Sequence, residues 1–251
     1  MTARIGLIIP SSNRMVEQEM TRHVPSGVQM HIARLRMTGG YHVPLDQLLP
    51  LVEDATGTLV DAKCDAIAFH CTANSTSEGL DGEQRLLTAV ARAGAPRATT
   101  TATAIKHAFD ALGARRIVLI TPYSAHTTEE ETEFLQSAGY DVLHAVGFAL
   151  KGSDAYCATP AQFWLERTLE SARPEADAYL LSCANISAFG IIDELERRID
   201  RPVITSNQAI LWDLLCQLDW QDRRSCPGRL CRLSSPAAPV RQHQLGQSGV
   251  N

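Results

Sequence analysis

Two cysteines stand at matching places in this sequence. Cys71 lies in AIAFHCTANS and Cys183 in AYLLSCANIS, so each follows an apolar run and precedes small, mostly polar residues. A thiol just beyond a buried strand can act as a nucleophile or as an acid and base without a cofactor. A cysteine in an apolar run is more often a small buried hydrophobic residue, and we expect that role for Cys64, Cys157 and Cys216.

The spacing of these two cysteines recurs elsewhere in the chain. The offset is 183 − 71 = 112, and RIGLIIPSSN at 4–13 aligns with RIVLITPYSA at 116–125 at the same offset, with six of ten positions identical. The segments that begin at Ala95 and Arg201 match at a slightly different offset, as loops of unequal length would produce. We therefore interpret the chain as two halves of one ancestral unit.

The elements that position these cysteines follow a regular pattern. Short β-rich runs alternate with longer helical patterns, which is typical of βαβ units around a parallel sheet. We predict strands near 4–9, 28–35, 65–70, 97–101, 116–121, 141–147, 177–182 and 202–205. We predict helices near 14–23, 45–62, 82–93, 102–112, 126–138, 159–172, 188–198 and 207–218.

The expected fold class is α/β, with two pseudo-symmetric Rossmann-like halves. Each half is a four-stranded parallel sheet flanked by helices, and the active site lies in the cleft between them. We expect an N-terminal half at 1–113, a C-terminal half at 114–222 and a disordered tail at 223–251, because the tail is rich in Pro, Ser, Gln and Gly and has no periodicity.

Composition argues against several classes of protein. The 251 residues are 45% hydrophobic, with a net charge of −5 and no basic cluster, so we expect no nucleic-acid partner. No run approaches the roughly 18–20 apolar residues of a membrane helix, and the N-terminus does not resemble a secretory signal. We therefore expect a cytoplasmic protein whose seven cysteines are thiols rather than disulfides.

Ligands of open parallel sheets bind outside the carboxyl ends of the strands. The two cysteines lie there, and if the halves pack with twofold pseudo-symmetry they face each other across one cleft. The only positive side chain that these motifs place nearby is Arg14. The histidines lack ligand spacing, so no metal is expected, and without a GxGxxG or P-loop pattern no cofactor is expected either. Small polar residues follow the other strands: Ser11, Ser12, Asn13, Tyr123, Ser124, Thr99, Thr100, Thr101, Ser206 and Asn207.

The motifs PSSN, FHCTANS, TPYS, LLSCANIS and PVITSNQAILW, in this order, resemble one known group of enzymes. They are similar to the maleate cis-trans isomerases and arylmalonate decarboxylases of the aspartate/glutamate racemase superfamily. The resemblance covers about residues 4 to 220. It implies a small dicarboxylate substrate and a homodimer.

The resemblance also implies roles for individual residues. Cys71 matches the nucleophilic cysteine of the isomerases, a position that is glycine in the decarboxylases. Cys183 matches the second cysteine, which serves as the acid. Asn13 and Tyr123 match ligands of the substrate carboxylates. The remaining expected substrate-binding positions are Ser12, Thr72, Ala73, Ser124, Ala184 and Asn185.

Two departures from the isomerase pattern bear on the substrate. Arg14 stands where the isomerases usually carry threonine, and a substrate-contacting asparagine is replaced within 152–154. We therefore expect substrate identity to be decided at these two places.

The expected reaction is isomerisation of maleate, or of a substituted cis-butenedioate, to the trans isomer. A thiolate at Cys71, with a pKa lowered by backbone N–H groups and a helix N-terminus, would add to the double bond. Cys183 would protonate or shield the carbanion opposite. The alternatives are an amino-acid or hydantoin racemase with a two-thiol acid/base pair, an arylmalonate decarboxylase-like enzyme and a non-catalytic dicarboxylate-binding protein.

Overall fold

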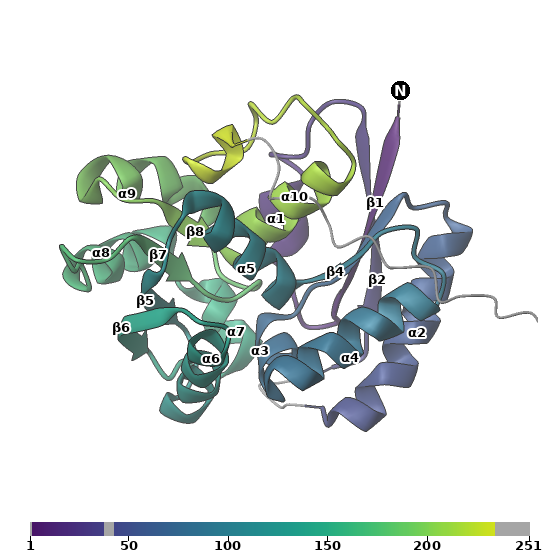
Figure 1. The fold of residues 1–251 in the computed structure, drawn as a ribbon, viewed down its shortest axis with the longest axis horizontal. Helices are drawn as coiled ribbons and strands as arrows, with labels where there is room; N and C mark the ends of the chain where they lie inside the picture. The colour runs from purple at the N-terminus through teal and green to yellow at the C-terminus, as the bar shows by residue number, and fades with distance from the viewer. Residues whose placement is uncertain (1, 38–42, 234–251) are drawn as a thin grey trace, which may run out of the picture.

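The structure, a computed structural model, describes residues 2–37 and 43–233. It contains two parallel sheets of four strands each, in the orders β2-β1-β3-β4 and β6-β5-β7-β8 (Figure 1). The predicted fold class is therefore confirmed. The first sheet consists of β1 (Ala3–Pro10), β2 (Val28–Leu35), β3 (Ala66–Phe69) and β4 (Ala98–Thr100). The second consists of β5 (Arg116–Thr121), β6 (Asp141–Gly147), β7 (Ala178–Leu181) and β8 (Val203–Thr205).

Helices cover both sheets. The first half carries α1 (Val16–Met20), α2 (Leu45–Asp61), α3 (Thr72–Thr76), α4 (Gly79–Arg92) and α5 (Thr101–Leu112). The second carries α6 (Ala125–Ser137), α7 (Gly152–Ala158), α8 (Ala161–Glu170), α9 (Ile192–Ile199) and α10 (Ser206–Gln217). Two short 3-10 turns, η1 (Phe189–Ile191) and η2 (Leu230–Arg232), complete the described chain.

Capping residues make helices begin directly at the ends of strands. The side-chain oxygens of Thr100, Ser124 and Thr205 accept hydrogen bonds from the backbone N–H three residues later, at 3.0, 3.3 and 3.1 Å. Each satisfies one of the unpaired donors in the first turn of a helix. Helix N-termini therefore gather at the edge of the sheets where the predicted site lies.

Two short helices at this edge, α3 and α7, were not predicted. Their sequences, TANST and GSDAYCA, have no apolar periodicity and are rich in residues with modest helix propensity. Tertiary contacts hold them instead. The Thr72 hydroxyl of α3, for example, donates to the Ser206 hydroxyl of α10 at 2.9 Å.

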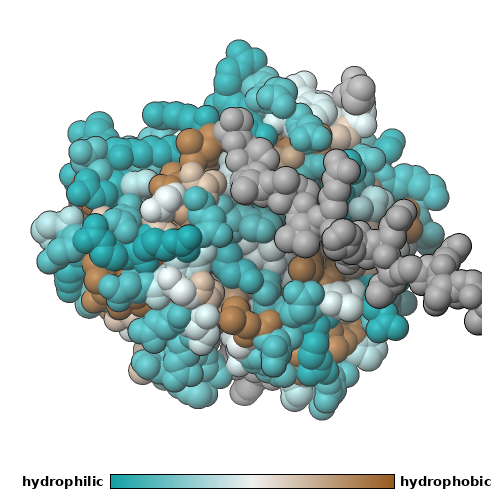
Figure 2. Space-filling view, viewed as in Figure 1, coloured by the Kyte–Doolittle hydropathy of each residue, from teal (hydrophilic) through white to brown (hydrophobic). Residues whose placement is uncertain are grey.

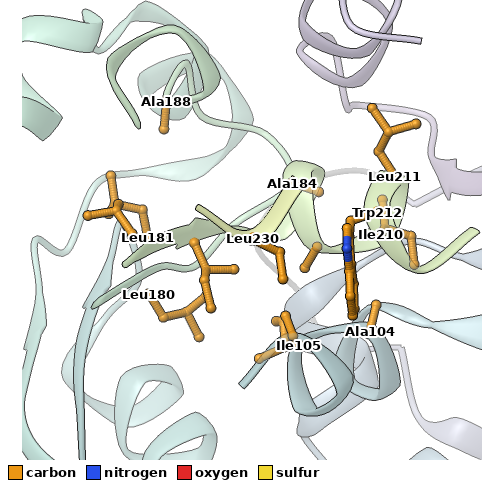
Figure 3. Close-up of a cluster of buried hydrophobic side chains, with 14 of the residues drawn as sticks. Ala104, Ile105, Leu180, Leu181, Ala184, Ala188, Ile210, Leu211, Trp212 and Leu230 are labelled. Atoms are coloured by element: carbon orange, nitrogen blue, oxygen red, sulfur yellow. The ribbon is translucent and has the colours of Figure 1, made fainter. Parts of the chain in front are cut away.

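One hydrophobic core joins the two halves. It includes Ile5 and Leu7 of β1 together with Leu180 of β7 and Trp212 of α10, all 0% exposed. Figure 3 shows side chains of α5, β7 and α10 meeting in this core. Helix α10 of the second half thus packs on α5 and on the first sheet, and a second, smaller core lies between β1, α2 and α4.

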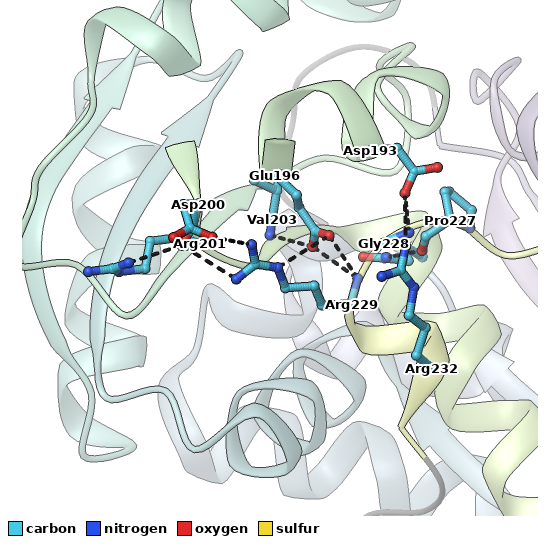
Figure 4. A network of polar contacts seen from close by, with 10 residues as sticks. Asp193, Glu196, Asp200, Arg201, Val203, Pro227, Gly228, Arg229 and Arg232 are labelled. Atoms are coloured by element: carbon cyan, nitrogen blue, oxygen red, sulfur yellow. Dashed lines mark hydrogen bonds and ion pairs between the residues drawn. The ribbon is translucent and has the colours of Figure 1, made fainter. Parts of the chain in front are cut away.

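The C-terminal segment 223–233 packs against the body of the protein. The Trp212 indole N–H donates to the Leu233 carbonyl at 3.3 Å, and Leu230 is 0% exposed. Figure 4 shows the polar part of this contact, where the Arg229 backbone N–H donates to Glu196 at 2.8 Å. This differs from the expectation of a tail that begins at 223, because residues with no periodicity are held here by individual contacts. The remainder of that tail, 234–251, lies outside the described residues.

The same segment corrects the expectation that all seven cysteines are thiols. Cys226 and Cys231 form a disulfide with their Cα atoms 5.7 Å apart. The turn at Pro227 and Gly228 brings the two residues together. The other five cysteines, Cys64, Cys71, Cys157, Cys183 and Cys216, are thiols.

Hydrophilic residues dominate the face seen in Figure 2, where the hydrophobic residues form small separate patches. Among the residues that the structure describes, the large hydrophobic side chains with substantial exposure are Leu51, Leu80 and Leu143, at 46%, 37% and 37%. Within residues 2–37 and 43–233, no helix is long and apolar enough to cross a membrane.

Candidate active site

A cavity of about 100 Å³ lies between the two halves, at the carboxyl ends of β1, β3, β5 and β7. Segments from both sheets reach it because each parallel strand ends at this edge. The residues that line it are Pro10, Ser12, Asn13, Met37, His70, Cys71, Thr72, Ala73, Asn74, Tyr123, Thr127, Ser153, Tyr156, Cys183, Ala184 and Asn185.

Cys71 follows β3 and stands at the N-cap position of α3. Its thiol donates a hydrogen bond to the Asn74 side-chain oxygen at 3.4 Å, and its side chain is partly exposed to the cavity. Behind it, His70 is fully buried. The neutral His70 ring donates from Nε2 to Asn207 at 2.9 Å and accepts at Nδ1 from Thr101 at 3.0 Å.

Cys183 follows β7 and reaches the same cavity from the other half. Its sulfur accepts a hydrogen bond from the Asn185 backbone N–H at 3.3 Å, and the Tyr123 hydroxyl faces it and opposes the rise in its pKa. The Tyr123 ring makes an edge contact with Tyr156 of α7, with the ring centroids 6.0 Å apart. The second thiol is therefore held by groups from three segments of the C-terminal half.

The structure corrects the expected acidity of Cys71. Burial raises the pKa of Cys71 to about 11 and that of Cys183 to about 12, whereas the sequence predicts a lowered pKa for Cys71. The cost of moving a thiolate away from water exceeds the stabilisation offered by the Asn74 backbone N–H at the start of a five-residue helix. Both thiols are therefore neutral at pH 7.

The cavity offers a carboxylate neutral donors only. None of the described residues that line it carries a positive charge, because burial lowers the pKa of His70 to about 4. Arg14 lies outside this lining and forms an exposed ion pair with Asp154 of α7 at 2.6 Å. Any anion bound here would be held by hydroxyl, amide and backbone N–H groups.

Asn13 ties the two sides of the cavity together. Its side-chain oxygen accepts from the Met15 and Val16 backbone N–H groups at 3.0 and 3.1 Å, which fixes the turn that leads into α1. Its amide donates to the Ala184 carbonyl at 3.0 Å, across the cleft. In the opposite direction, the Asn185 side-chain oxygen of the C-terminal half accepts a hydrogen bond from the Arg14 backbone N–H at 2.9 Å.

Nine of the ten residues predicted for the site line this cavity, namely Cys71, Cys183, Asn13, Ser12, Thr72, Ala73, Tyr123, Ala184 and Asn185. The exception is Ser124, which caps α6 and is exposed. Their roles in a reaction stay predictions.

Seven lining residues were not predicted: Pro10, Met37, His70, Asn74, Thr127, Ser153 and Tyr156. Pro10, His70 and Asn74 belong to the motifs PSSN and FHCTANS, so the motifs contained a signal for them. Ser153 falls in the segment expected to decide the substrate. Met37, Thr127 and Tyr156 have no sequence signal, because only folding brings their segments to the cleft.

Within the described residues, no three His, Cys, Asp or Glu side chains gather in a way that could hold a metal ion. The side chains of this cavity supply two thiols, two phenols, several aliphatic hydroxyls and several amides.

A sequence profile described as arylmalonate decarboxylase matches residues 5–231. The chain belongs to this family. The resemblance expected from the motifs is thereby confirmed.

The relatives include two kinds of enzyme. The maleate isomerase of Nocardia farcinica is 26% identical over 242 residues, which cover 92% of this chain and 96% of that one. The arylmalonate decarboxylase of Bordetella bronchiseptica is 26% identical over 215 residues, 84% of this chain and 89% of that one.

Solved structures share the fold. A cysteine-to-serine mutant of the Nocardia farcinica maleate cis-trans isomerase, solved with a covalently bound succinylcysteine intermediate, superposes with a TM-score of 0.84. It is 24% identical, and the match covers 92% of this chain and 99% of that one. The backbone of that structure matches both halves of this chain.

Proposed function

We propose that this protein is a cofactor-independent isomerase that converts maleate, or a substituted cis-butenedioate, to the trans isomer. The observation that carries the proposal is the pair of thiols, Cys71 and Cys183, which reach one cavity from the two halves of the chain. Family membership supports it, as do the relatives named maleate isomerase.

In the proposed reaction Cys71 is the nucleophile. Its thiolate forms a bond from sulfur to one alkene carbon, and the π electron pair moves onto the other carbon and its carboxylate. The double bond has become a single bond, so the chain of the substrate can rotate. The electron pair then returns, the trans double bond forms and the carbon–sulfur bond breaks, which regenerates the thiolate.

The enediolate would be held by neutral donors. We assign this role to the Asn13 amide, the Ser12 and Tyr123 hydroxyls, and the backbone N–H groups of Thr72, Ala73 and Ala184. The Asn185 N–H is already taken by the Cys183 sulfur. A well-placed donor to such an oxyanion contributes about 3–4 kcal/mol in other enzymes. Cys183, on the opposite wall, would donate its proton to the carbanionic carbon and, as a thiolate, take a proton back from that carbon when the trans double bond forms and the carbon–sulfur bond breaks.

Because both thiols are neutral at pH 7, the ionised form of Cys71 is a minor species. We therefore expect turnover to rise with pH, since a larger fraction of Cys71 is then thiolate. The homodimer expected from the resemblance remains part of the proposal.

The test is incubation with maleate in D2O, with fumarate followed by NMR and adducts on the Cys71 peptide followed by mass spectrometry. We expect fumarate from the wild-type protein. We expect a loss of rate of at least about 100-fold in Cys71→Ser and in Cys183→Ser, a loss typical for removal of a nucleophile or an acid. A succinyl adduct on Cys71 in the Cys183→Ser protein would identify the nucleophile.

Other outcomes contradict the proposal in distinct ways. Deuterium exchange at the α-carbon of an amino acid or hydantoin, without fumarate, would show a racemase. Release of CO2 from an arylmalonate by the Cys71→Ser protein would show a decarboxylase that needs only Cys183. Binding of dicarboxylates without any turnover would show a binding protein. If maleate is not converted, substituted butenedioates are tested before cis-trans isomerisation is rejected as the reaction.

A further inference from the structure

The two thiols come from equivalent places in two similar halves, yet the proposed reaction gives them different roles. One must ionise and the other must keep its proton. Some feature of the structure must therefore make their surroundings unequal.

The buried acid Glu131 of α6 is 1% exposed and reaches the end of β7 next to Cys183. One of its carboxyl oxygens accepts a hydrogen bond from the hydroxyl of Ser182, the residue that directly precedes Cys183. The other, Oε2, has no hydrogen-bond partner among the described residues. A carboxylate with an unpaired buried oxygen is costly for the fold, so it suggests a functional role.

The equivalent acid in the first half is arranged differently. Glu19 stands at the same offset, 131 − 19 = 112, and is also buried. Both of its oxygens are engaged: one accepts the Ala188 and Phe189 backbone N–H groups at 2.8 and 3.0 Å, and the other accepts the Asn207 amide at 2.9 Å. Glu19 thus accepts hydrogen bonds from the loop after Cys183 and makes no hydrogen bond to the Cys71 thiol.

The groups that face the two thiols differ accordingly. Cys183 is faced by Tyr123 of the β5–α6 turn, by Tyr156 of α7, by Cys71 across the cavity and by Glu131 of α6. Cys71 instead donates to the neutral side chain of Asn74. Burial is the main cause of the raised pKa of Cys183, and a negative charge on Glu131 adds to it, whereas the pKa of Cys71 is raised by burial alone.

We propose that Glu131 is the positioning residue that assigns the roles of the two thiols, since its carboxylate, fixed by Ser182, keeps Cys183 protonated as the acid and leaves Cys71 to ionise. This inference rests on the proposed two-thiol reaction. It concerns the thiols themselves, so it can be tested without any substrate.

The test measures the alkylation rate of each thiol by iodoacetamide, with peptide mass spectrometry, in wild type and Glu131→Gln. Burial raises the pKa of Glu131 to about 7, so the comparison is made at about pH 5.5 and about pH 8.5. At the higher pH, Glu131→Gln should alkylate Cys183 about tenfold faster than wild type, equivalent to one pKa unit. At the lower pH wild-type Glu131 is already neutral, and the two proteins should agree.

Glu19→Gln is the matched control, because it neutralises the equivalent buried acid of the other half. We expect it to leave the ratio of Cys183 to Cys71 alkylation unchanged at both pH values. Cys71 should change by less than about twofold in Glu131→Gln, since the charge acts on Cys183.

A merely structural role for Glu131 would change Cys183 alkylation equally at both pH values, and that result would overturn the proposal. An equal rise in the alkylation rate of Cys71 would also overturn it.

If Glu131→Gln does not fold, Ser182→Ala replaces it. Loss of the hydroxyl donor should raise the pKa of Glu131, so the inflection near pH 7 in the Cys183 alkylation profile should move to higher pH. An inflection that stays in place would refute the role.

Absence of maleate turnover, by contrast, would refute the proposed function and leave the alkylation result standing. The proposed isomerase function and the proposed role of Glu131 can therefore be refuted independently.

Discussion

Asn13 shows how one side chain at the cleft combines two tasks. Its oxygen accepts two backbone N–H groups before α1 and one of its amide hydrogens bonds to the Ala184 carbonyl, so a single amide hydrogen is left for a ligand. Serine or aspartate could also accept from these N–H groups. The amide is required because it must donate to a carbonyl of the other half.

Asn13→Asp is therefore expected to damage both stability and binding. The new carboxyl oxygen would face the Ala184 carbonyl, and a buried unsatisfied acceptor costs about 1–3 kcal/mol. Urea unfolding measures this loss, and KM for maleate should rise. Ser12→Ala, in the same turn, is the control and should stay within about 0.5 kcal/mol of wild type. Equal stability of Asn13→Asp and wild type would contradict the role.

Among the elements, the C-terminal segment 223–233 makes backbone contacts that depend on one glycine. Gly228 has φ +82°, and a Cβ there would lie 2.7 Å from Ile192 and 2.8 Å from Gln208. Its N–H donates to Asp193 at 3.0 Å (Figure 4). The turn therefore needs both left-handed backbone and space, which only glycine supplies.

Gly228→Ala should lower the free energy of unfolding by about 2–4 kcal/mol, from strain and overpacking together. Gly113→Ala is the matched control: it has φ +66° with nothing within 4 Å, so it should cost only about 1 kcal/mol. Thermal melts of both variants test this. A Gly228→Ala protein as stable as Gly113→Ala would mean that the segment contributes little, as the expectation of a loose tail from 223 would require.

At the scale of the whole molecule, the two halves are similar in topology but share a core. Helix α10 packs on α5, on α1 and on β3 and β4 of the first sheet. Leu7 and Trp212, one from each half, belong to the same buried cluster. A fragment that ends at the expected boundary of 113 would expose this surface to water.

We therefore expect neither fragment 1–113 nor fragment 114–233 to fold alone. In the intact chain, far-UV circular dichroism and tryptophan fluorescence should report one coincident urea transition, because the shared core makes unfolding cooperative. The control is a mixture of the two fragments, which should regain native circular dichroism if the shared surface is what each lacks. Two separate transitions in the intact chain would show that the halves are independent domains.

The sequence by itself determined the local elements and the order in which they occur. Buried parallel strands such as IGLII and IVLI are apolar throughout, and amphipathic helices follow them, so the strands and most helices could be located by pattern. The offset of 112 between Cys71 and Cys183 indicated the repeat, and the topology rule for parallel sheets then placed both thiols at one edge.

The tertiary structure alone decided what surrounds those thiols. Desolvation depends on every segment packed around a group. It raises the pKa of Cys71, although the nearby helix start and backbone amides predict a lowered pKa. The same holds for α3 and α7, whose short polar sequences fold through contacts with other segments. It holds for Glu131, which lies 52 residues from Cys183 in the sequence (183 − 131) yet bonds to Ser182, the residue before this thiol. Interactions within a turn or strand depend on residues that are neighbours in the sequence, whereas burial and electrostatic fields arise only when distant segments pack together.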